Sequence, residues 1–184
     1  MNTEIYIVLG ILAIIFIYFI VTYNTLVKLS NIVKEAFATM DVYFKKRWDL
    51  IPNLVSVVKG YAKHETDVLE NVVKLRNTAY DKMSLTDKID ANEQIANGLS
   101  KLMAIVENYP DLKASQNFSD LHRQLVQLEN DIANARKYYN AVVRNMNTKI
   151  QMFPSNIVAN MFKFETATMF EANANEKDNV KVEL

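Results

Sequence analysis

The side chains in this sequence that could do chemistry include only two histidines, His64 and His122. His64 with the glutamate after it resembles the start of a zinc-protease helix, but Val68 stands where the second histidine is required. A di-iron site in a helical bundle needs Glu-x-x-His pairs, and Tyr61 and Ser119 stand at the glutamate positions. The sequence has no cysteine, no glycine-rich phosphate loop and no serine elbow. We therefore predict no enzyme activity, no catalytic residue, no bound metal and no cofactor.

Two glutamates carry more information, because they fall on or beside the apolar edges of expected helices. Counted from the turns that precede them, Glu65 and Glu129 both lie about 20 Å along their helices at ~1.5 Å per residue, so we expect them in one layer. A buried carboxylate needs a partner. The favoured interpretation is ion pairs between helices with Arg136, Arg76 or Lys59, which fix the helix register. The alternative is an acidic pocket for a cation or a proton.

The stretch RWDLIPN, residues 47–53, places a cation, an indole and a carboxylate just before a proline. Proline lacks an amide hydrogen and disfavours helix at the preceding residue, so we expect a break or sharp kink here. The favoured interpretation is a corner between two helices, in which Asp49 caps the second helix or pairs with Arg47. In an alternative interpretation, Trp48 is exposed at this corner and is contacted by a partner.

Four helices are expected to position these residues, because apolar residues recur at alternating steps of four and three. This spacing is the 3.5-residue period of helices packed side by side. It runs through residues 29–50, 54–79, 95–109 and 121–146. The spacing is lost at residues 84–94 and 108–117 and at Pro154, where we expect the helices to be separated. Only three glycines and three prolines interrupt the chain, too few for a sheet protein.

The first residues differ from the rest, because Ile5–Tyr23 contains no charged residue. At ~1.5 Å per residue this stretch reaches roughly 28 Å, close to the ~30 Å of a hydrocarbon core. No Lys or Arg precedes it, so a retained transmembrane anchor is favoured over a cleaved signal peptide. Lys28 and Lys34 follow it. The positive-inside rule therefore predicts an outside N-terminus and a cytoplasmic helical domain.

The expected fold is all-α, with an N-terminal transmembrane helix followed by an antiparallel, up-down four-helix bundle. We place the anchor at residues 1–23, the bundle at 24–153 and a C-terminal segment at 154–184. Because four alternating helices end where they began, that segment should return to the membrane surface. Its apolar first half is expected to dock on the base of the bundle, and the alternative is insertion into the lipid interface. Its polar tail is expected to be loosely ordered.

Several motifs, taken in order, resemble the LemA family of bacterial membrane-anchored proteins. They are YNTLV (23–27), MDVYFKKRWDLIPNLV (40–55), VKGYAKHE (58–65), ENYPDLKASQNF (107–118), ENDIANARKYYNAVV (129–143) and FPSNIVANMF (153–162). The resemblance covers nearly all of residues 23–170 and implies a single span followed by an antiparallel helical bundle. It implies no reaction. One relative is associated with magnetosome membranes, which supports a role in membrane organisation by analogy only.

The function expected from these features is that of a non-enzymatic scaffold or adaptor at the cytoplasmic face of the bacterial inner membrane. It would contact the lipid bilayer through residues 5–23 and unidentified membrane or envelope proteins through its polar surface. The alternative is a self-assembling protein that organises the membrane as a homo-oligomer, and a metal- or ligand-binding bundle is less favoured. With 21 basic and 21 acidic residues, the formal net charge is zero, so no nucleic-acid partner is expected.

Overall fold

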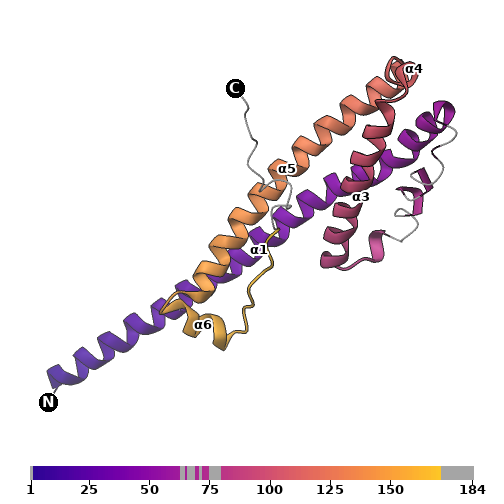
Figure 1. Ribbon diagram of the computed structural model, residues 1–184. Helices are drawn as coiled ribbons and strands as arrows, with labels where there is room; N and C mark the ends of the chain where they lie inside the picture. The colour runs from indigo at the N-terminus through magenta and orange to yellow at the C-terminus, as the bar shows by residue number, and fades with distance from the viewer. Residues whose placement is uncertain (1, 63–64, 66–68, 71, 75–79, 171–184) are drawn as a thin grey trace, which may run out of the picture. The chain divides into compact units, whose positions relative to one another are not determined.

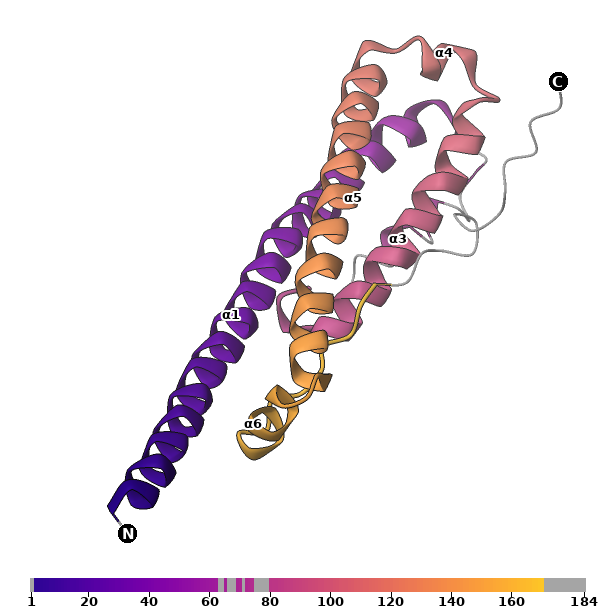
Figure 2. The same ribbon diagram turned by 90° about the vertical axis from the view of Figure 1, so that its left-hand side faces the viewer.

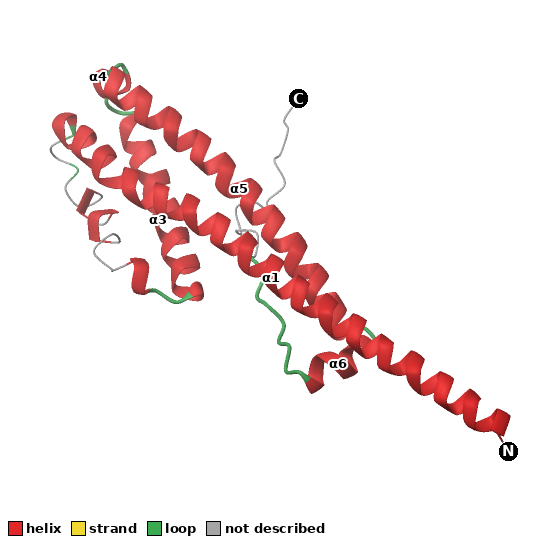
Figure 3. Ribbon diagram, turned by 180° about the vertical axis from the view of Figure 1, so that it is seen from behind, coloured by secondary structure: helices red, strands yellow, loops and turns green. Residues whose placement is uncertain are grey.

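A computed structural model describes residues 2–62, 65, 69–70, 72–74 and 80–170. Among these residues every regular element is a helix and none is a strand (Figure 3). In chain order the elements are α1 (Asn2–Tyr61), the short 3-10 helix η1 (Tyr80–Lys82), α3 (Leu85–Val106), α4 (Pro110–Lys113), α5 (Gln116–Gln151) and α6 (Ser155–Met161) (Figure 1). They form two compact units, a terminal unit (Met1–Ala38 with Ala135–Leu184) and a central unit (Thr39–Asn134). The all-α prediction is confirmed for the described residues.

The predicted corner before Pro52 is wrong, because α1 continues through the proline to Tyr61. Proline removes one backbone hydrogen bond and bends a helix, and Figure 2 shows α1 changing direction in its last turns. The helix persists because Arg47, Ile51, Leu54 and Val58, which are all buried, carry one 4-3-4 packing edge past the proline. The chain turns about three helical turns later than predicted. The helix predicted for residues 54–79 therefore begins inside α1, and part of it lies outside the described residues.

Helix α3 begins about ten residues before the start that its apolar residues predict, so the expected loop over residues 84–94 is also wrong. Ser84 caps it by accepting a hydrogen bond from the backbone N–H of Asp87, whose carboxylate in turn accepts from the backbone N–H of Ser84. The packing edge does not stop at Ile95. It continues toward the N-terminus through Asn92 and Lys88 with the same alternation of three and four, but in polar residues.

The remaining helix boundaries follow the sequence closely. The short helix α4 occupies the predicted turn at residues 108–117, with Pro110 in its first turn. Helix α5 starts at Gln116, within the last two residues of the predicted turn, and ends at Gln151, three residues before Pro154. Its buried residues Leu125, Leu128, Ile132, Tyr139, Val142 and Met146 follow the predicted edge.

In the terminal unit, an extended segment runs along α5 and is held by two asparagines. The side-chain amide of Asn147 donates to the Ala167 carbonyl (2.8 Å) and its oxygen accepts from the Ala167 N–H (2.9 Å). Asn140 makes the same pair of bonds with Phe170, at 2.9 Å each. Seven helical residues and three extended residues both span about 10 Å, which is why the two pairings fit one register. At Thr168, between these two paired residues of the extended segment, the backbone carbonyl accepts a hydrogen bond from the Tyr139 hydroxyl (3.1 Å).

Helix α6 packs into the terminal unit by its inner side. Ser155, Val158 and Ala159 are buried, and the Ser155 hydroxyl donates to the carbonyls of Lys149 and Met152. The inner side of α6 is thus packed against other residues of the terminal unit, and docking on the base of a bundle stays a prediction. The outer side of α6 is exposed and apolar.

Candidate functional site

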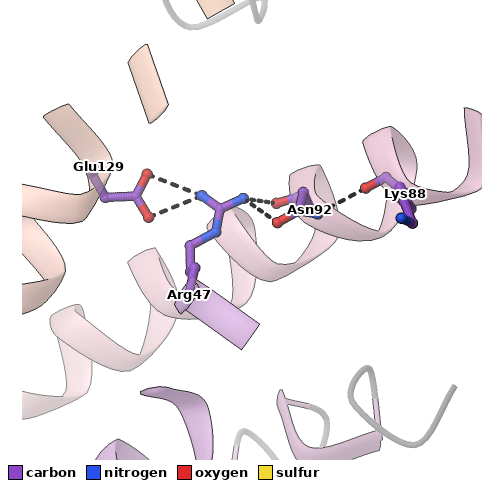
Figure 4. A network of polar contacts seen from close by, with 4 residues as sticks. All are labelled: Arg47, Lys88, Asn92 and Glu129. Carbon is purple, nitrogen blue, oxygen red and sulfur yellow. Dashed lines mark hydrogen bonds and ion pairs between the residues drawn. The ribbon is translucent and has the colours of Figure 1, made fainter. Parts of the chain in front are cut away.

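The most deeply buried charge among the described residues is Arg47, whose side chain is 1% exposed. Figure 4 shows its guanidinium between two helices. Nη1 donates to both carboxylate oxygens of Glu129 on α5 (2.9 and 3.0 Å). Nη2 donates to the backbone oxygen (2.8 Å) and the side-chain oxygen (2.9 Å) of Asn92 on α3. One cation thus joins α1, α3 and α5 within the central unit by four charge-assisted hydrogen bonds.

A second polar cluster lies one to two turns away along α1 and is linked to the first through Asn92, whose amide donates to the Lys88 carbonyl (2.9 Å). The carboxylate of Asp41 accepts from the ammonium of Lys88 (2.7 Å) and from the hydroxyl of Tyr80 (2.6 Å). Burial, and then the adjacent Asp41 carboxylate, raise the pKa of Tyr80 above its ordinary value. The phenol therefore stays protonated at neutral pH and serves as a hydrogen-bond donor.

These two clusters fix the direction and register of the helices. Asp41 and Arg47 follow each other on α1 as Lys88 and Asn92 do on α3, so α1 and α3 run parallel in the central unit. By Tyr80 the chain is again beside Asp41, twenty residues before the end of α1. The arrangement therefore specifies which helix faces meet, a role that buried ion pairs can have.

The prediction that Glu129 forms an ion pair between helices is correct, but the predicted partner is wrong. Its partner is Arg47, from the apolar edge of α1, and not Arg136. Glu65 instead accepts a 3.3 Å hydrogen bond from the hydroxyl of Tyr109, just beyond the end of α3. Asn92 marks the level of Glu129 on α3, and Tyr109 marks the level of Glu65. From Asn92 to the end of α3, just before Tyr109, the helix rises about 20 Å. The two glutamates therefore do not share a layer, and the acidic-pocket interpretation loses its basis.

Two other predicted residues have different surroundings from those expected. Trp48 is 6% exposed and packs on Tyr80, with ring centroids 5.1 Å apart, so it is not displayed at a corner. Asp49 is exposed within α1 and caps no helix. The polar residues that the sequence analysis missed are Asp41, Lys88 and Asn92. The continued spacing of Lys88 and Asn92 from Ile95 was the signal that could have found the last two.

Of the two histidines, His122 alone lies in the part of the chain that the structure describes. His122 stacks on Phe118 at 5.7 Å between ring centroids. His64 and Arg76 lie outside the described residues, and Lys59 is exposed. Across residues 2–62, 65, 69–70, 72–74 and 80–170, no group of three or more His, Cys, Asp or Glu side chains could hold a metal ion. Burial, and then the nearby Glu65, raise the pKa of Tyr109, and burial raises the pKa of Tyr139.

The N-terminal part of α1 exposes a long run of large apolar side chains. Helix α1 is long and apolar enough to cross a membrane, and only 6% of its most apolar stretch is buried. Large side chains in this stretch are mostly exposed, for example Tyr6 (71%) and Phe16 (66%). A core helix of a soluble protein would bury such a stretch, and the described residues of this chain leave it uncovered.

This apolar surface continues onto α6. Tyr23, which ends the uncharged stretch, contacts Phe162 with ring centroids 4.6 Å apart and Phe164 at 6.0 Å. A groove of about 630 Å³ lies between them, and its walls carry apolar and aromatic side chains only. These are Leu12, Ile15, Phe16, Phe19, Ile20 and Tyr23 of α1 with Met161 and Phe162. The candidate functional site is therefore this continuous apolar surface of the terminal unit.

Comparisons with known proteins agree with the motif resemblance. A model of the LemA family matches residues 36–184. The chain is 26% identical over 161 residues to Protein LemA of Metamycoplasma hominis, covering 85% of this chain and 72% of that relative. It is 25% identical over 175 residues to Magnetosome protein MamQ 2 of Paramagnetospirillum magneticum, covering 81% of this chain and 64% of that relative. Because the family match spans well over half of the sequence, this chain is a member of the LemA family.

Proposed function

We propose that this chain is a non-enzymatic, single-pass membrane-anchored helical scaffold that presents a rigid domain to other proteins of the bacterial cell envelope. The observation that carries the proposal is the exposed, uncharged stretch Ile5–Tyr23, which continues without a break into the helix that holds the buried Arg47 network. A long helix that joins an exposed, bilayer-length apolar stretch to a network of buried ion pairs and hydrogen bonds between helices fits a tethered structural protein.

The body of the scaffold in this proposal is an up-down four-helix bundle over residues 24–153, between an anchor at 1–23 and a C-terminal segment at 154–184. The parallel direction of α1 and α3 in the central unit supports this order. So does α5, which contacts α1 through Glu129 and Arg47 in the central unit and through Tyr139 and Phe37 (6.0 Å between ring centroids) in the terminal unit, so that residue numbers rise along one helix as they fall along the other. The helix predicted for residues 54–79, which this order requires, lies partly in α1 and partly outside the described residues.

The proposed orientation has the N-terminus outside and the helical domain in the cytoplasm, at the inner membrane. The basic residues Lys28 and Lys34, which follow the span, support it. Protease treatment of intact spheroplasts checks it with a C-terminal epitope tag. Protection until the membrane is permeabilised is expected, and cleavage in sealed spheroplasts would reverse the orientation.

A surface suited to an adaptor role lies between α3 and α5 in the central unit. It is an open groove of about 600 Å³ that mixes small, apolar and ionisable side chains, including Ala96, Ser100, Met103, His122, Val126 and Glu129. A mixed lining of this kind is typical of surfaces that bind partners reversibly, more than of a closed core. Because Trp48 is buried, we propose that a partner binds in this groove and not at Trp48.

Photo-crosslinking in cells tests the adaptor role. A photoreactive residue is placed at Ser100 or at Val126 in the groove, with Lys101, exposed on α3 beside the groove, as the matched control. A distinct partner band from both groove positions and not from Lys101 supports the adaptor. Crosslinks that are equal at all three positions would refute it.

The alternative function is self-assembly into a membrane-organising homo-oligomer. It is favoured by the exposed outer side of α6 next to the span and by the likeness to relatives that are named magnetosome proteins. Chemical crosslinking of the full-length chain in membranes separates the two functions. A ladder of multiples of the chain mass supports assembly, whereas a single heterologous product supports the adaptor.

A further inference from the structure

We propose that residues 152–162 form a second membrane contact, which lies in the headgroup layer beside the span and holds a lipid acyl chain against it. The inference rests on the proposed function, because it requires Ile5–Tyr23 to cross a bilayer. The surface concerned, here called the outer α6 surface, consists of Met152, Phe153, Ile157, Met161 and Phe162.

The outer α6 surface is exposed although its residues are large and apolar. Phe153 is 79% exposed, and the other four are between 49% and 56% exposed. The opposite side of the same short helix is packed, since Val158 and Ala159 are fully buried. The segment is therefore held in place by its inner side while its outer side meets whatever surrounds the molecule. The exposed residues of this segment include Asn160, but most of them are large and apolar, which fits a boundary between protein and lipid better than one between protein and water.

The position of this surface along α1 indicates what surrounds it. Phe162 contacts Tyr23 at 4.6 Å, and Tyr23 ends the uncharged stretch, at the level where a membrane-spanning helix passes from hydrocarbon to headgroups. Met161 and Phe162 also line the groove whose other wall reaches from Tyr23 back to Leu12. The outer α6 surface thus adjoins the part of α1 that must be covered by lipid, and the same lipid can cover both.

The chemistry of the segment fits the interface of a bilayer. Aromatic and large aliphatic side chains settle at the boundary between headgroups and acyl chains, and flanking lysines extend toward the phosphates. Lys149 and Lys163 stand on either side of the segment in the sequence. The groove is apolar along its whole length and open to the outside, which suits a flexible hydrocarbon chain and not a polar ligand.

Single-cysteine labelling of the full-length chain tests the proposal directly, because the natural sequence has no cysteine. Phe153→Cys and Ile157→Cys are each labelled with an environment-sensitive fluorophore and reconstituted into vesicles of phosphatidylcholine and phosphatidylglycerol. Lipids that carry bromine atoms on their acyl chains act as quenchers. Phe16→Cys reports on the span. Tyr138→Cys, an exposed aromatic position on α5 about 21 Å along the helix from Met152, is the water-exposed control.

We expect blue-shifted emission and loss of fluorescence in brominated lipid at positions 153, 157 and 16, and neither effect at position 138. Emission from 153 and 157 that is water-like, while 16 is quenched, would overturn the second contact and leave the anchor intact. Blue-shifted but unquenched emission at 153 and 157 would also overturn it, because a protein surface would then cover α6. Absence of quenching at 16 would instead refute the anchor and the proposed function.

Discussion

Removal of the Glu129 carboxylate gives the sharpest test of the central unit. In Glu129→Leu, the guanidinium of Arg47 keeps its two bonds to Asn92 but loses its counter-charge while its side chain remains 1% exposed. Breaking a buried ion pair from one side costs about 3–5 kcal/mol. Because the Glu129 side chain is 42% exposed, water can reach the vacated position, and we expect a smaller loss than this, about 2–3 kcal/mol.

Removal of the cation should have a different consequence. In Arg47→Met the partly exposed carboxylate of Glu129 is left to water, and the main cost comes from the two Asn92 oxygens that lose a donor, about 1–3 kcal/mol. The double variant removes both charges, so it should be more stable than the sum of the single losses implies. We expect a coupling energy of about 1–2 kcal/mol, in the range found for residues in contact.

The assay is urea unfolding of the full-length chain in one detergent, followed by the fluorescence of Trp48. This is the only tryptophan in the sequence, and it is buried against Tyr80 in the same unit. Asp120→Leu, which removes an exposed ion pair with Arg123 on α5, is the matched control, with an expected loss of at most about 0.5 kcal/mol. Equal stability of Glu129→Leu and Asp120→Leu would refute the assignment of Arg47 as a buried, paired cation.

The other predictions concern local contacts. Because the pKa of Tyr80 is raised in the folded state, its phenol contributes fully to folding stability below the ordinary pKa of 10.0, and this contribution is lost as the pH rises from 10.0 through the raised pKa. The variant Tyr80→Phe should therefore lose less stability at alkaline pH than the natural chain, as measured by denaturation at stepped pH. Ser84→Ala should destabilise α3 by about 1 kcal/mol in thermal unfolding, and an unchanged midpoint would argue against the cap. Asn147→Ala should cost about 1–2 kcal/mol and speed amide exchange at Ala167, whereas Asn145→Ala, at an exposed position two residues earlier, should leave that amide unchanged.

The sequence predicted most of α5 and the break before it at residues 108–117, because apolar spacing and local breakers act there without competition. At Pro52 it failed, because packing on both sides of the proline outweighs one lost backbone hydrogen bond. At residues 84–94 it failed for another reason. The packing edge of α3 continues there in Lys88 and Asn92, and a search for apolar residues ends where the partners become Asp41 and Arg47.

The apolar surface could be predicted from the sequence more completely than the polar network could. Arg47 and Glu129 both stood out from the sequence, but which cation meets which carboxylate depends on the azimuth of each helix, which an error in one helix boundary changes. The uncharged stretch Ile5–Tyr23 needs no such geometry, because its length and composition alone decide where it is stable. The exposed side of α6 required the structure, since the same sequence pattern also fits full docking.

The pairing of Asn140 and Asn147 with the extended chain has a consequence for how the region around Ala167 and Phe170 can vary. The amides read only main-chain atoms, so at position 167 many side chains would be accepted without loss of the bonds. Spacing, by contrast, is constrained. Insertion or deletion of a single residue between 167 and 170 would displace one of the two contacts by ~3.3 Å, more than a hydrogen bond can stretch. This stretch should therefore be permissive to point substitution and intolerant of any change in length.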